Sequence, residues 1–258
     1  MSSVLIVGAT RGLGASLTKM YAQQDGTTVY GTTRSNKTPA DFPGNVKWIQ
    51  NIDLMDSKAA DELVAQLKGA RTLDSVIITA GFFHTEDLSL KKGPNWDDEV
   101  RMYTTSSIAP VFIVHRLLHA GLLKAKSKIV FVSSESGSIT LRHEVEGGGN
   151  YAHHASKAAL NMTAKLLSMD LKGRDIIVST VHPGFMRTEM TKGVGFDKYW
   201  DEGGAVTPDE AARSLVNWIA DLDISKTGQY WAPRGAGDIG TAEAVLGKNL
   251  AVPLQLPW

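Results

Sequence analysis

The 258-residue chain contains no cysteine, which excludes several classes of function. Disulfide-stabilised folds, thiolate zinc sites and cysteine nucleophiles all require a sulfhydryl group. The chain also has no excess of charge of either sign, because its 27 Lys and Arg residues are matched by 27 Asp and Glu residues. A balanced charge gives no electrostatic reason to expect a nucleic acid or an anionic membrane as a partner. We therefore expect a small-molecule ligand.

Long apolar runs are absent as well, and no run in the sequence has the length needed to span a bilayer. The apolar run that ends at Val7 is shorter than the apolar core of a signal peptide, and Gly8 and Arg11 interrupt it. No linker, repeat or low-complexity tract divides the chain. The sequence therefore predicts one domain over residues 1–258, with the cytoplasm as its default location.

The sequence does contain a regular alternation of short β-branched runs and longer amphipathic stretches. The short runs predict strands over residues 4–7, 27–31, 46–52, 76–79, 128–132, 176–181 and 228–231. The longer stretches predict helices over residues 13–24, 58–67, 97–123, 155–171 and 208–221. Most of the strands are apolar almost throughout, as expected for parallel strands that are buried on both faces. This alternation predicts right-handed crossovers and a doubly wound parallel α/β sheet of about seven strands.

Two glycine-rich segments do not fit the alternation. Residues 142–150 contain three consecutive glycines and predict a loop. Residues 189–207 contain four glycines together with Phe196, Tyr199 and Trp200. Because long loops often carry function, this second segment predicts either a substrate lid or an ordinary excursion of the chain.

A glycine-rich turn directly follows the first predicted strand and opens the first predicted helix. Its candidate binding residues are Gly8, Thr10, Arg11, Gly12, Leu13 and Gly14. Glycines let backbone N–H groups come close to a pyrophosphate, and a helix N-terminus favours an anion. The position between a strand and an amphipathic helix distinguishes such a site from an ordinary turn. The sequence therefore predicts a dinucleotide-binding domain of the Rossmann type.

The end of the second predicted strand lacks the carboxylate that would favour NAD. An acidic residue there would bind the adenosine ribose hydroxyls, but this chain has Thr33 and Arg34 instead. Arg34 and Arg11 together suit the 2′-phosphate of NADP(H), because guanidinium groups bind phosphate bidentately. The alternative is that both are solvated surface arginines. We expect NADP(H) rather than NAD(H).

The glycine spacing Gly8-xxx-Gly12-x-Gly14 resembles that of the short-chain dehydrogenase/reductase family. Further motifs of that family follow in order along nearly the whole chain: Asp53 and Leu54, Ala80 and Gly81, Ser133 and Ser134, Ser156 and Lys157, and Pro183, Gly184, Met186 and Thr188. The ending Leu256-Pro257-Trp258 is similar to that of the carbonyl-reductase-like branch.

The resemblance implies a hydride transfer between a nicotinamide cofactor and a carbonyl or alcohol carbon. It implies that Ser134 binds the substrate oxygen and that Lys157 holds the nicotinamide ribose. Thr188 and the backbone around Met186 would hold the carboxamide of the nicotinamide. The remaining motif residues that it places at the cofactor are Asp53, Leu54, Ala80, Gly81, Pro183 and Gly184. It also implies a homodimer or homotetramer built partly from the helices that contain Ser106 and Lys157.

The chain departs from the family at the proton donor. The family has a tyrosine four residues before the lysine, where His153 stands here, and Tyr151 is two residues further back. A neutral imidazole is a poor acid, so donation by His153 would need Glu135 or a substrate carboxylate to raise its pKa. Tyr151 is the alternative donor if the helix begins later than expected and Tyr151 reaches the site from the N-terminus of the helix. Ser106 replaces the helical asparagine of the family, and no cluster of metal ligands is evident.

These departures leave three functions open. The first is an NADP(H)-dependent oxidoreductase that acts on an apolar carbonyl or alcohol. The second is a non-redox isomerase, cyclase or dehydratase that uses His153 as an acid or base on the same fold. The third is a non-catalytic dinucleotide-sensing protein, because fold alone does not determine function.

Overall fold

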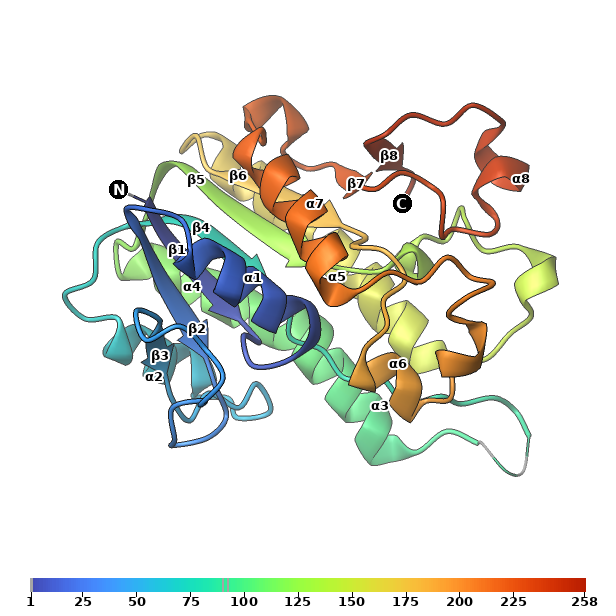
Figure 1. The fold of residues 1–258 in the computed structure, drawn as a ribbon, viewed down its shortest axis with the longest axis horizontal. Coiled ribbons are helices and arrows are strands. Elements are labelled where there is room, and N and C mark those ends of the chain that lie inside the picture. The colour runs from blue at the N-terminus through green and yellow to red at the C-terminus, as the bar shows by residue number, and fades with distance from the viewer. Residues whose placement is uncertain (1, 90, 92) are drawn as a thin grey trace.

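The computed structural model describes residues 2–89, 91 and 93–258, and it has a central sheet between two layers of helices (Figure 1). Over those residues the sheet has eight strands in the order β3-β2-β1-β4-β5-β6-β7-β8. Seven strands are parallel, and β8 runs antiparallel to β7. The strand bounds are β1 Ser2–Val7, β2 Thr27–Thr32, β3 Lys47–Ile49, β4 Leu73–Ile78, β5 Leu123–Val132, β6 Ile177–Val181, β7 Tyr230–Ala232 and β8 Leu254–Leu256. The predicted doubly wound α/β fold is confirmed.

The longer helices divide between the two faces of the sheet. One face is covered by α1 (Gly12–Ala22) and α7 (Pro208–Ala220), which stand in front in Figure 1. The other is covered by α2 (Ala59–Gln66), α4 (Ala109–His119) and α5 (Tyr151–Lys172). The other helices are α3 Trp96–Tyr103, α6 Glu189–Gly193 and α8 Ala242–Leu246.

Burial on both faces explains why the strands are apolar almost throughout. Leu5 and Phe131 belong to the core on the side of α2, α4 and α5. Ile6 and Val130, the chain neighbours of those two residues, belong to the core beneath α1 and α7. Because successive side chains of a strand point to opposite faces, both sets of positions need apolar residues.

The strand β8 was not expected from the sequence. It is three residues long, lies between Pro253 and Pro257, and pairs Leu256 with Tyr230 of β7. Such a short segment between two prolines carries no periodic signal. It forms because β7 offers an unpaired edge, and its side chains complete a third small core.

The prediction of one helix over residues 97–123 is wrong. The chain instead forms α3, a π-helical turn over Thr104–Ile108, and then α4, which ends at His119. In the π-helical turn the N–H of Ala109 donates to the carbonyl of Thr104. Pro110 follows and has no N–H to continue the α-helical pattern. Gly121, with φ of +68°, then turns the chain into β5, which begins five residues earlier than expected.

The helix α5 begins at Tyr151, four residues before the predicted start. Its N-cap residue, Asn150, has a left-handed conformation and no side-chain capping bond of its own. The carboxylate of Glu86, from the segment after β4, accepts from the N–H of Ala152 at 2.5 Å instead. A long-range cap of this kind has no local sequence signal.

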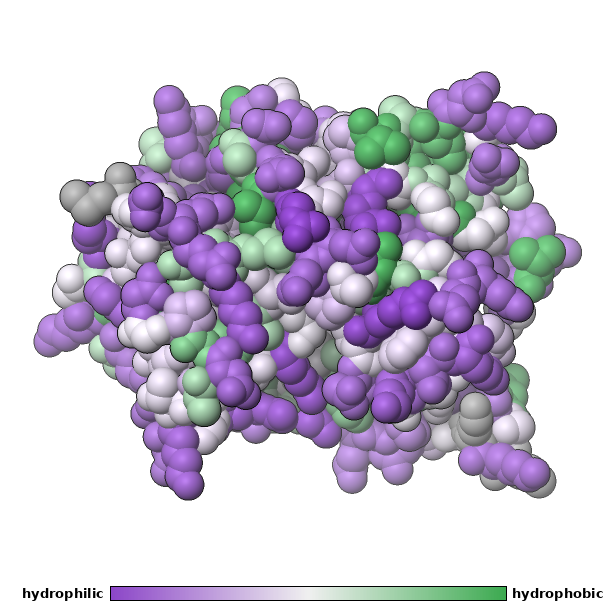
Figure 2. Space-filling model, in the orientation of Figure 1, coloured by the Kyte–Doolittle hydropathy of each residue, from purple (hydrophilic) through white to green (hydrophobic). Residues whose placement is uncertain are grey.

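The surface in the orientation of Figure 1 is mostly hydrophilic, with scattered apolar residues (Figure 2). Among the described residues, no helix combines the length and the apolar character that crossing a membrane requires.

Candidate active site

A cavity of about 1030 Å³ lies at the carboxyl ends of the parallel strands, where the strand order reverses between β1 and β4. This is the usual position of a ligand in an open α/β sheet. The candidate site residues that line it are Gly8, Thr10, Arg11, Gly12, Leu13, Gly14, Thr33, Arg34, Asp53, Leu54, Ala80, Gly81, Ser134, Tyr151, His153, Lys157, Pro183, Gly184, Met186 and Thr188. Ser106 does not line it.

The glycine-rich turn is too tight for other residues at two positions. A Cβ on Gly14 would lie 2.0 Å from the carbonyl oxygen of Gly8, and Gly8 itself has φ of +92°. Thr79, directly after β4, donates from Oγ1 to the carbonyl of Val7 at 3.0 Å. The N-terminus of α1 has no side-chain cap and no acidic residue in its first turn. Its N–H groups are therefore available to an anion.

Two exposed guanidinium groups lie at the cavity near this turn. Arg11 is the N-cap residue of α1, and Arg34 follows the buried Thr33 at the end of β2. Within residues 2–89, 91 and 93–258, neither Arg11 nor Arg34 has a carboxylate partner. On the same side of the cavity, Leu54 is buried and Asp53 is exposed.

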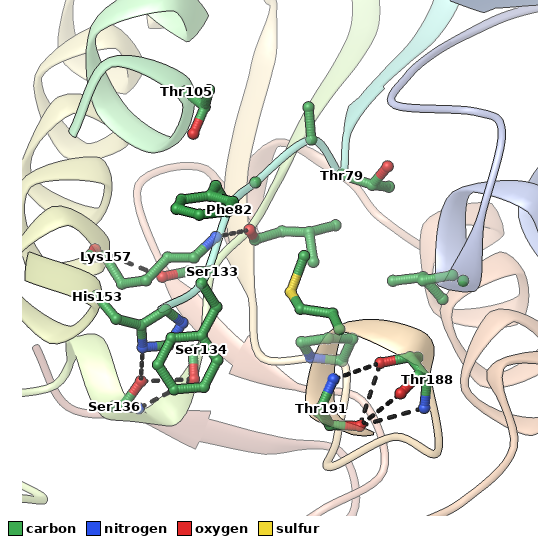
Figure 3. Close-up of a pocket in the computed structure, with 18 of the residues that line it drawn as sticks. Thr79, Phe82, Thr105, Ser133, Ser134, Ser136, His153, Lys157, Thr188 and Thr191 are labelled. Carbon is green, nitrogen blue, oxygen red and sulfur yellow. Dashed lines mark hydrogen bonds between the residues drawn. The ribbon is translucent and has the colours of Figure 1, made fainter. Parts of the chain in front are cut away.

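Lys157 lies on the face of α5 that meets the end of β5 (Figure 3). Its Nζ donates to the carbonyl of Val132 at 3.0 Å. Burial lowers the pKa of Lys157 to about 8. A Cβ on Gly81 would lie 3.8 Å from Nζ, so this glycine leaves the ammonium group open to the cavity.

Ser106 lies on the π-helical turn behind Gly81. It is buried, and a Cβ on Gly81 would lie 4.0 Å from its Oγ. Among the described residues its hydroxyl has no hydrogen-bond partner. The π-helical turn therefore brings Ser106 close to Lys157 but not to the wall of the cavity.

His153 occupies an enclosed position one helical turn before Lys157. Its Nδ1 lies 3.5 Å from Oγ of Ser136, and its ring lies against that of Phe83, with centroids 4.2 Å apart. Burial lowers the pKa of His153 well below its ordinary value, and the positive charge of Lys157 lowers it further. The imidazole is therefore neutral near pH 7.

The expectation that Glu135 raises the pKa of His153 is not met. The carboxylate of Glu135 pairs with the guanidinium of Arg142, and the net effect of the surroundings on the pKa of His153 is downward. Because the side chain of Glu135 is committed to Arg142, it cannot serve as a counter-ion for the imidazole ring.

Tyr151 is the first residue of α5 and is 40% exposed. Its hydroxyl lies near the loop before the helix, 3.8 Å from where a Cβ on Gly148 would stand. Among the described residues it makes no hydrogen bond to Ser134 or Ser136. Although both Tyr151 and His153 line the cavity, only His153 contacts the serines after β5.

Ser134 lies at the start of a 3₁₀ turn after β5. Its Oγ accepts from the hydroxyl of Ser136 at 2.7 Å and from the N–H of Ser136 at 3.3 Å. Beneath it, the hydroxyl of Tyr230 donates to the carbonyl of Ser134 at 2.5 Å. The position of Ser134 is thus fixed from two sides.

His182, which follows β6, has a position within the site. Its Nδ1 accepts from the N–H of Glu135 at 3.0 Å, and its Nε2 donates to the carboxylate of Asp238 at 2.9 Å. The same carboxylate accepts from the N–H of Phe185. Burial opposes ionisation of Asp238, but the bonds from His182 and Phe185 lower its pKa overall. This network joins the turn after β5 to the segment after β6.

The chain is similar to known proteins in sequence and in fold. The family described as short chain dehydrogenase matches residues 2–198. The chain belongs to the short-chain dehydrogenase family.

Relatives cover most of the chain at low identity. An uncharacterized oxidoreductase of Schizosaccharomyces pombe is 30% identical over 245 residues, with 88% of this chain and 93% of that protein covered. The 1-hydroxy-2-glutathionyl-2-methyl-3-butene dehydrogenase of a Rhodococcus species is 25% identical over 232 residues, with coverages of 89% and 96%. The solved NADPH-bound carbonyl reductase from chicken fatty liver has a TM-score of 0.77 and 23% identity, with coverages of 100% and 94%. The last similarity concerns the fold alone.

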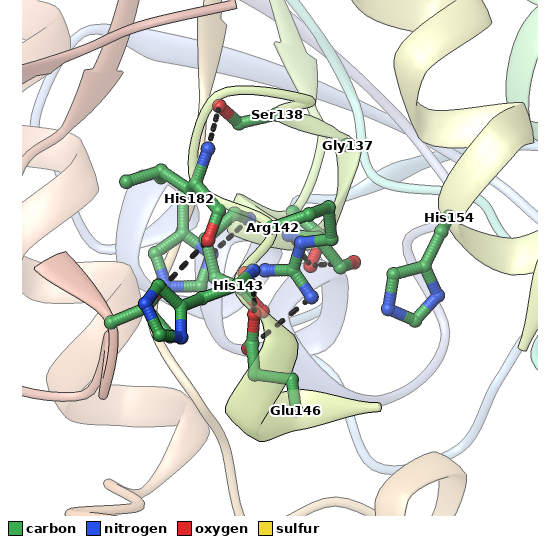
Figure 4. Close-up of polar contacts among 12 residues, drawn as sticks. Gly137, Ser138, Arg142, His143, Glu146, His154 and His182 are labelled. Atoms are coloured by element: carbon green, nitrogen blue, oxygen red, sulfur yellow. Dashed lines mark hydrogen bonds and ion pairs between the residues drawn. The ribbon is translucent and has the colours of Figure 1, made fainter. Parts of the chain in front are cut away.

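A charged cluster forms one rim of the cavity in this family member. Arg142 lies between Glu135 and Glu146, with its Nη1 3.3 Å from the carboxylate of Glu146, and His154 lies to one side (Figure 4). Because both carboxylates contact the guanidinium group, the cluster offers little net positive charge to a substrate.

The segment 189–207, for which a lid was one expectation, lines the opposite side. Met190, Phe196 and Tyr199 face the cavity, and the ring of Phe196 lies 5.6 Å from that of Phe83. The base of the segment is held by an ion pair between Arg187 and Asp201 at 2.6 Å. The wall around His153 is therefore largely aromatic.

Sequence reasoning did not assign a role to Phe83, Ser136 or Asp238. Ser136 had a weak local signal, because it is two residues after Ser134 in a serine-rich run. Phe83 had a similarly weak signal, because it is two residues after Gly81, whereas Asp238 had none, since it reaches the site from a loop distant in sequence.

Proposed function

We propose that the protein is an NADP(H)-dependent oxidoreductase that interconverts a carbonyl group and an alcohol on an apolar substrate. One observation carries the proposal: the glycine-rich turn, the Lys157 ammonium and the Ser134 hydroxyl all face the same cavity. Membership of the short-chain dehydrogenase family supports the same reaction class.

The donor groups around the cavity fit NADP(H). The uncapped N–H groups of α1 suit the pyrophosphate, and Arg11 and Arg34 suit the 2′-phosphate. The solved chicken carbonyl reductase, which has the same fold, is described as NADPH-bound. The pair Asp53 and Leu54 would lie at the adenine. The residues that would hold the nicotinamide end are Ala80, Gly81, Lys157, Pro183, Gly184, Met186 and Thr188.

When bound, the cofactor supplies or accepts the hydride, and the protein supplies position and a proton. Ser134 donates its hydroxyl hydrogen to the substrate oxygen, because its own acceptor sites are occupied by Ser136. Lys157 has two N–H groups beyond the one bound to Val132, and they suit the ribose hydroxyls. Its positive charge also favours the developing negative charge on the substrate oxygen.

The aromatic wall favours an apolar substrate. The ring of Phe83 lies against His153 and that of Phe196 lies near Phe83, whereas the rim at Arg142 has two carboxylates for one guanidinium group and so has no net positive charge for an anionic substrate. We propose that the segment 189–207 acts as the lid over this substrate.

The proposal is tested by mixing the purified protein and NADPH with a panel of apolar aldehydes and ketones. We expect loss of NADPH absorbance together with an equal amount of alcohol. The variant Ser134→Ala should lower kcat about 100-fold or more while the Kd for NADPH stays unchanged. Tight NADPH binding without turnover of any carbonyl compound or alcohol would contradict the proposal.

A non-redox reaction is the second candidate, and the environment of His153 favours it. A neutral imidazole near pH 7 suits a general base for an isomerisation, cyclisation or dehydration. Product formed without net oxidation of NADPH would support this function. An equal stoichiometry of product and oxidised cofactor would exclude it.

We also propose a homodimer or homotetramer that assembles through α4 and α5. The outer faces of these helices expose apolar side chains, among them Phe112 at 51%, Leu166 at 54% and Met169 at 61%. A chain with no net charge does not repel a second copy of itself. Burial of these side chains against the same surface of a second copy would remove them from water.

A further inference from the structure

The hydroxyl group of Ser136 lies between the side chains of Ser134 and His153. Its Oγ is 2.7 Å from Oγ of Ser134 on one side and 3.5 Å from Nδ1 of His153 on the other (Figure 3). Ser136 itself is only 6% exposed. In the proposed function this serine only occupies the acceptor sites of Ser134 and moves no proton.

The directions of the hydrogen bonds follow from the number of available hydrogens. A serine hydroxyl has one hydrogen, and that of Ser136 is donated to Ser134. Oγ of Ser136 can therefore only accept from His153, which requires the hydrogen of the neutral imidazole to be on Nδ1. Ser134 receives two hydrogen bonds from Ser136, so its own hydrogen is free to point into the cavity.

The arrangement is a continuous series of donors that leads from the imidazole to the cavity. The geometry points to Ser136 as a catalytic proton relay, through which a neutral His153 protonates the substrate oxygen that Ser134 binds. This inference rests on the proposed carbonyl reduction and adds to it the route of the proton.

The proton steps balance as follows. As the carbonyl carbon gains a hydride, the electron pair of its π bond moves to the oxygen, which takes the hydrogen of Ser134. Oγ of Ser134 then takes the hydrogen of Ser136, and Oγ of Ser136 takes the Nδ1 hydrogen of His153. Nε2 of His153 gains a proton from water, so the ring stays neutral while its hydrogen moves from Nδ1 to Nε2. Proton exchange with water returns the hydrogen to Nδ1 before the next turnover, and the net consumption is one proton from solvent.

The relay explains how this site could work without a tyrosine at position 153. Direct donation would need an imidazolium ion, which the buried surroundings and the nearby Lys157 disfavour. In the relay, His153 loses one proton as it gains another. The ring of Phe83, tilted 35° to the imidazole and 4.2 Å from it between centroids, limits the movement of the imidazole.

The first test needs neither cofactor nor turnover. Nitrogen NMR of the histidine rings in the purified protein should show His153 protonated on Nδ1. The variant Ser136→Ala removes the acceptor and should shift the Nδ1 signal, whereas Ser138→Ala, a buried serine on the same segment that bonds to Leu141, should not. A hydrogen on Nε2 in the unaltered protein would overturn the relay.

The second test compares turnover in the same variants. Ser136→Ala should lower kcat about 100-fold or more with the Kd for NADPH unchanged. Ser136→Thr, which keeps the hydroxyl, should restore most of the rate, and Ser138→Ala should retain it. The turnover rate of the unaltered enzyme should fall nonlinearly as the deuterium fraction of the solvent rises, because several protons move together.

The two proposals fail in different ways. If the unaltered enzyme reduces a carbonyl compound and Ser136→Ala is equally fast, the relay is wrong and the oxidoreductase remains. If the unaltered enzyme reduces no carbonyl compound, both are wrong.

Discussion

At the scale of single residues, the sequence predicted which side chains gather at the cavity better than it predicted what they do there. Apart from the buried Ser156, the motif residues from Gly8 to Thr188 line one cavity because each follows the carboxyl end of a parallel strand or the start of a helix. The ionisation of His153 depends on burial and on the charge of Lys157, and the burial of a side chain has no local signal in the sequence. The ion pair between Glu135 and Arg142 also has no local signal in the sequence.

The two arginines near the glycine-rich turn give a prediction about cofactor choice. Arg34→Ala should weaken NADPH binding about 10- to 100-fold and leave NADH binding nearly unchanged, because a charge-assisted bond contributes about 1.5 to 3 kcal/mol. Calorimetric titration of both cofactors measures this. Arg213→Ala, an exposed arginine on α7, is the matched control. Equal weakening of both cofactors would contradict the assignment to the 2′-phosphate.

Lys157 gives a prediction about stability and pH. Its pKa falls from 10.5 to about 8 on folding, so its buried charge costs about 3 kcal/mol at neutral pH. The unfolded chain binds more protons between these two values, and the cost is therefore relieved as pH rises from about 8 to 10.5. Lys157→Met should raise the free energy of unfolding by about 2 kcal/mol near pH 7, after loss of the bond to Val132, and abolish turnover.

Denaturant unfolding of Lys157→Met and the unaltered protein at several pH values checks this prediction. The difference between the two should shrink as the pH approaches 10.5. A difference that stays constant with pH would show that the charge is not the cause.

At the scale of elements, the sequence predicted helices and strands where the periodic hydrophobic pattern extended over a long segment. It did not predict the ends of elements that are set by tertiary contacts. The helix α7 begins at Pro208, as predicted, because Thr207 and Glu210 form a capping box that the sequence displays. The helix α5 begins earlier than predicted because Glu86 caps it from a distant loop. The start of α5 sets the directions in which the side chains of Tyr151 and His153 point.

The cap of α5 gives a prediction about pH and stability. The carboxyl of Glu99 on α3 shares a hydrogen with that of Glu86, and this bond, burial and the charge of Glu86 raise the pKa of Glu99 to about 7. The folded chain therefore binds more protons than the unfolded chain between 4.5 and about 7, and stability falls as pH rises through that window. Glu99→Gln should remove most of this dependence.

Thermal or denaturant unfolding between about pH 5 and about pH 8 measures the effect. Glu62→Gln, at an exposed position on α2, should keep the dependence of the unaltered protein. The idea is wrong if Glu99→Gln and Glu62→Gln respond to pH in the same way.

At the scale of the whole molecule, the apolar strands were enough to predict a parallel sheet covered on both faces. The antiparallel β8 was missed because three residues between prolines form a strand only when a neighbouring edge is present. Formation of an oligomer would depend on surface side chains, and the sequence alone does not show which apolar residues remain exposed.

The exposed faces of α4 and α5 give a prediction about assembly. Sedimentation of the unaltered protein should give a dimer or tetramer, and Leu166→Asp should reduce it to a monomer, because the charge would be buried at the contact. Leu88→Asp, at another exposed leucine, should leave the assembly unchanged. A monomeric unaltered protein would refute the proposed interface.

The most direct test of the central claim is a calorimetric titration of the purified protein with NADPH. The account predicts one site per chain, with NADPH bound more tightly than NADH, because the turn from Gly8 to Gly14 and the two arginines offer donors to all three phosphate groups. Absence of heat and of any bound nucleotide with both cofactors would contradict it.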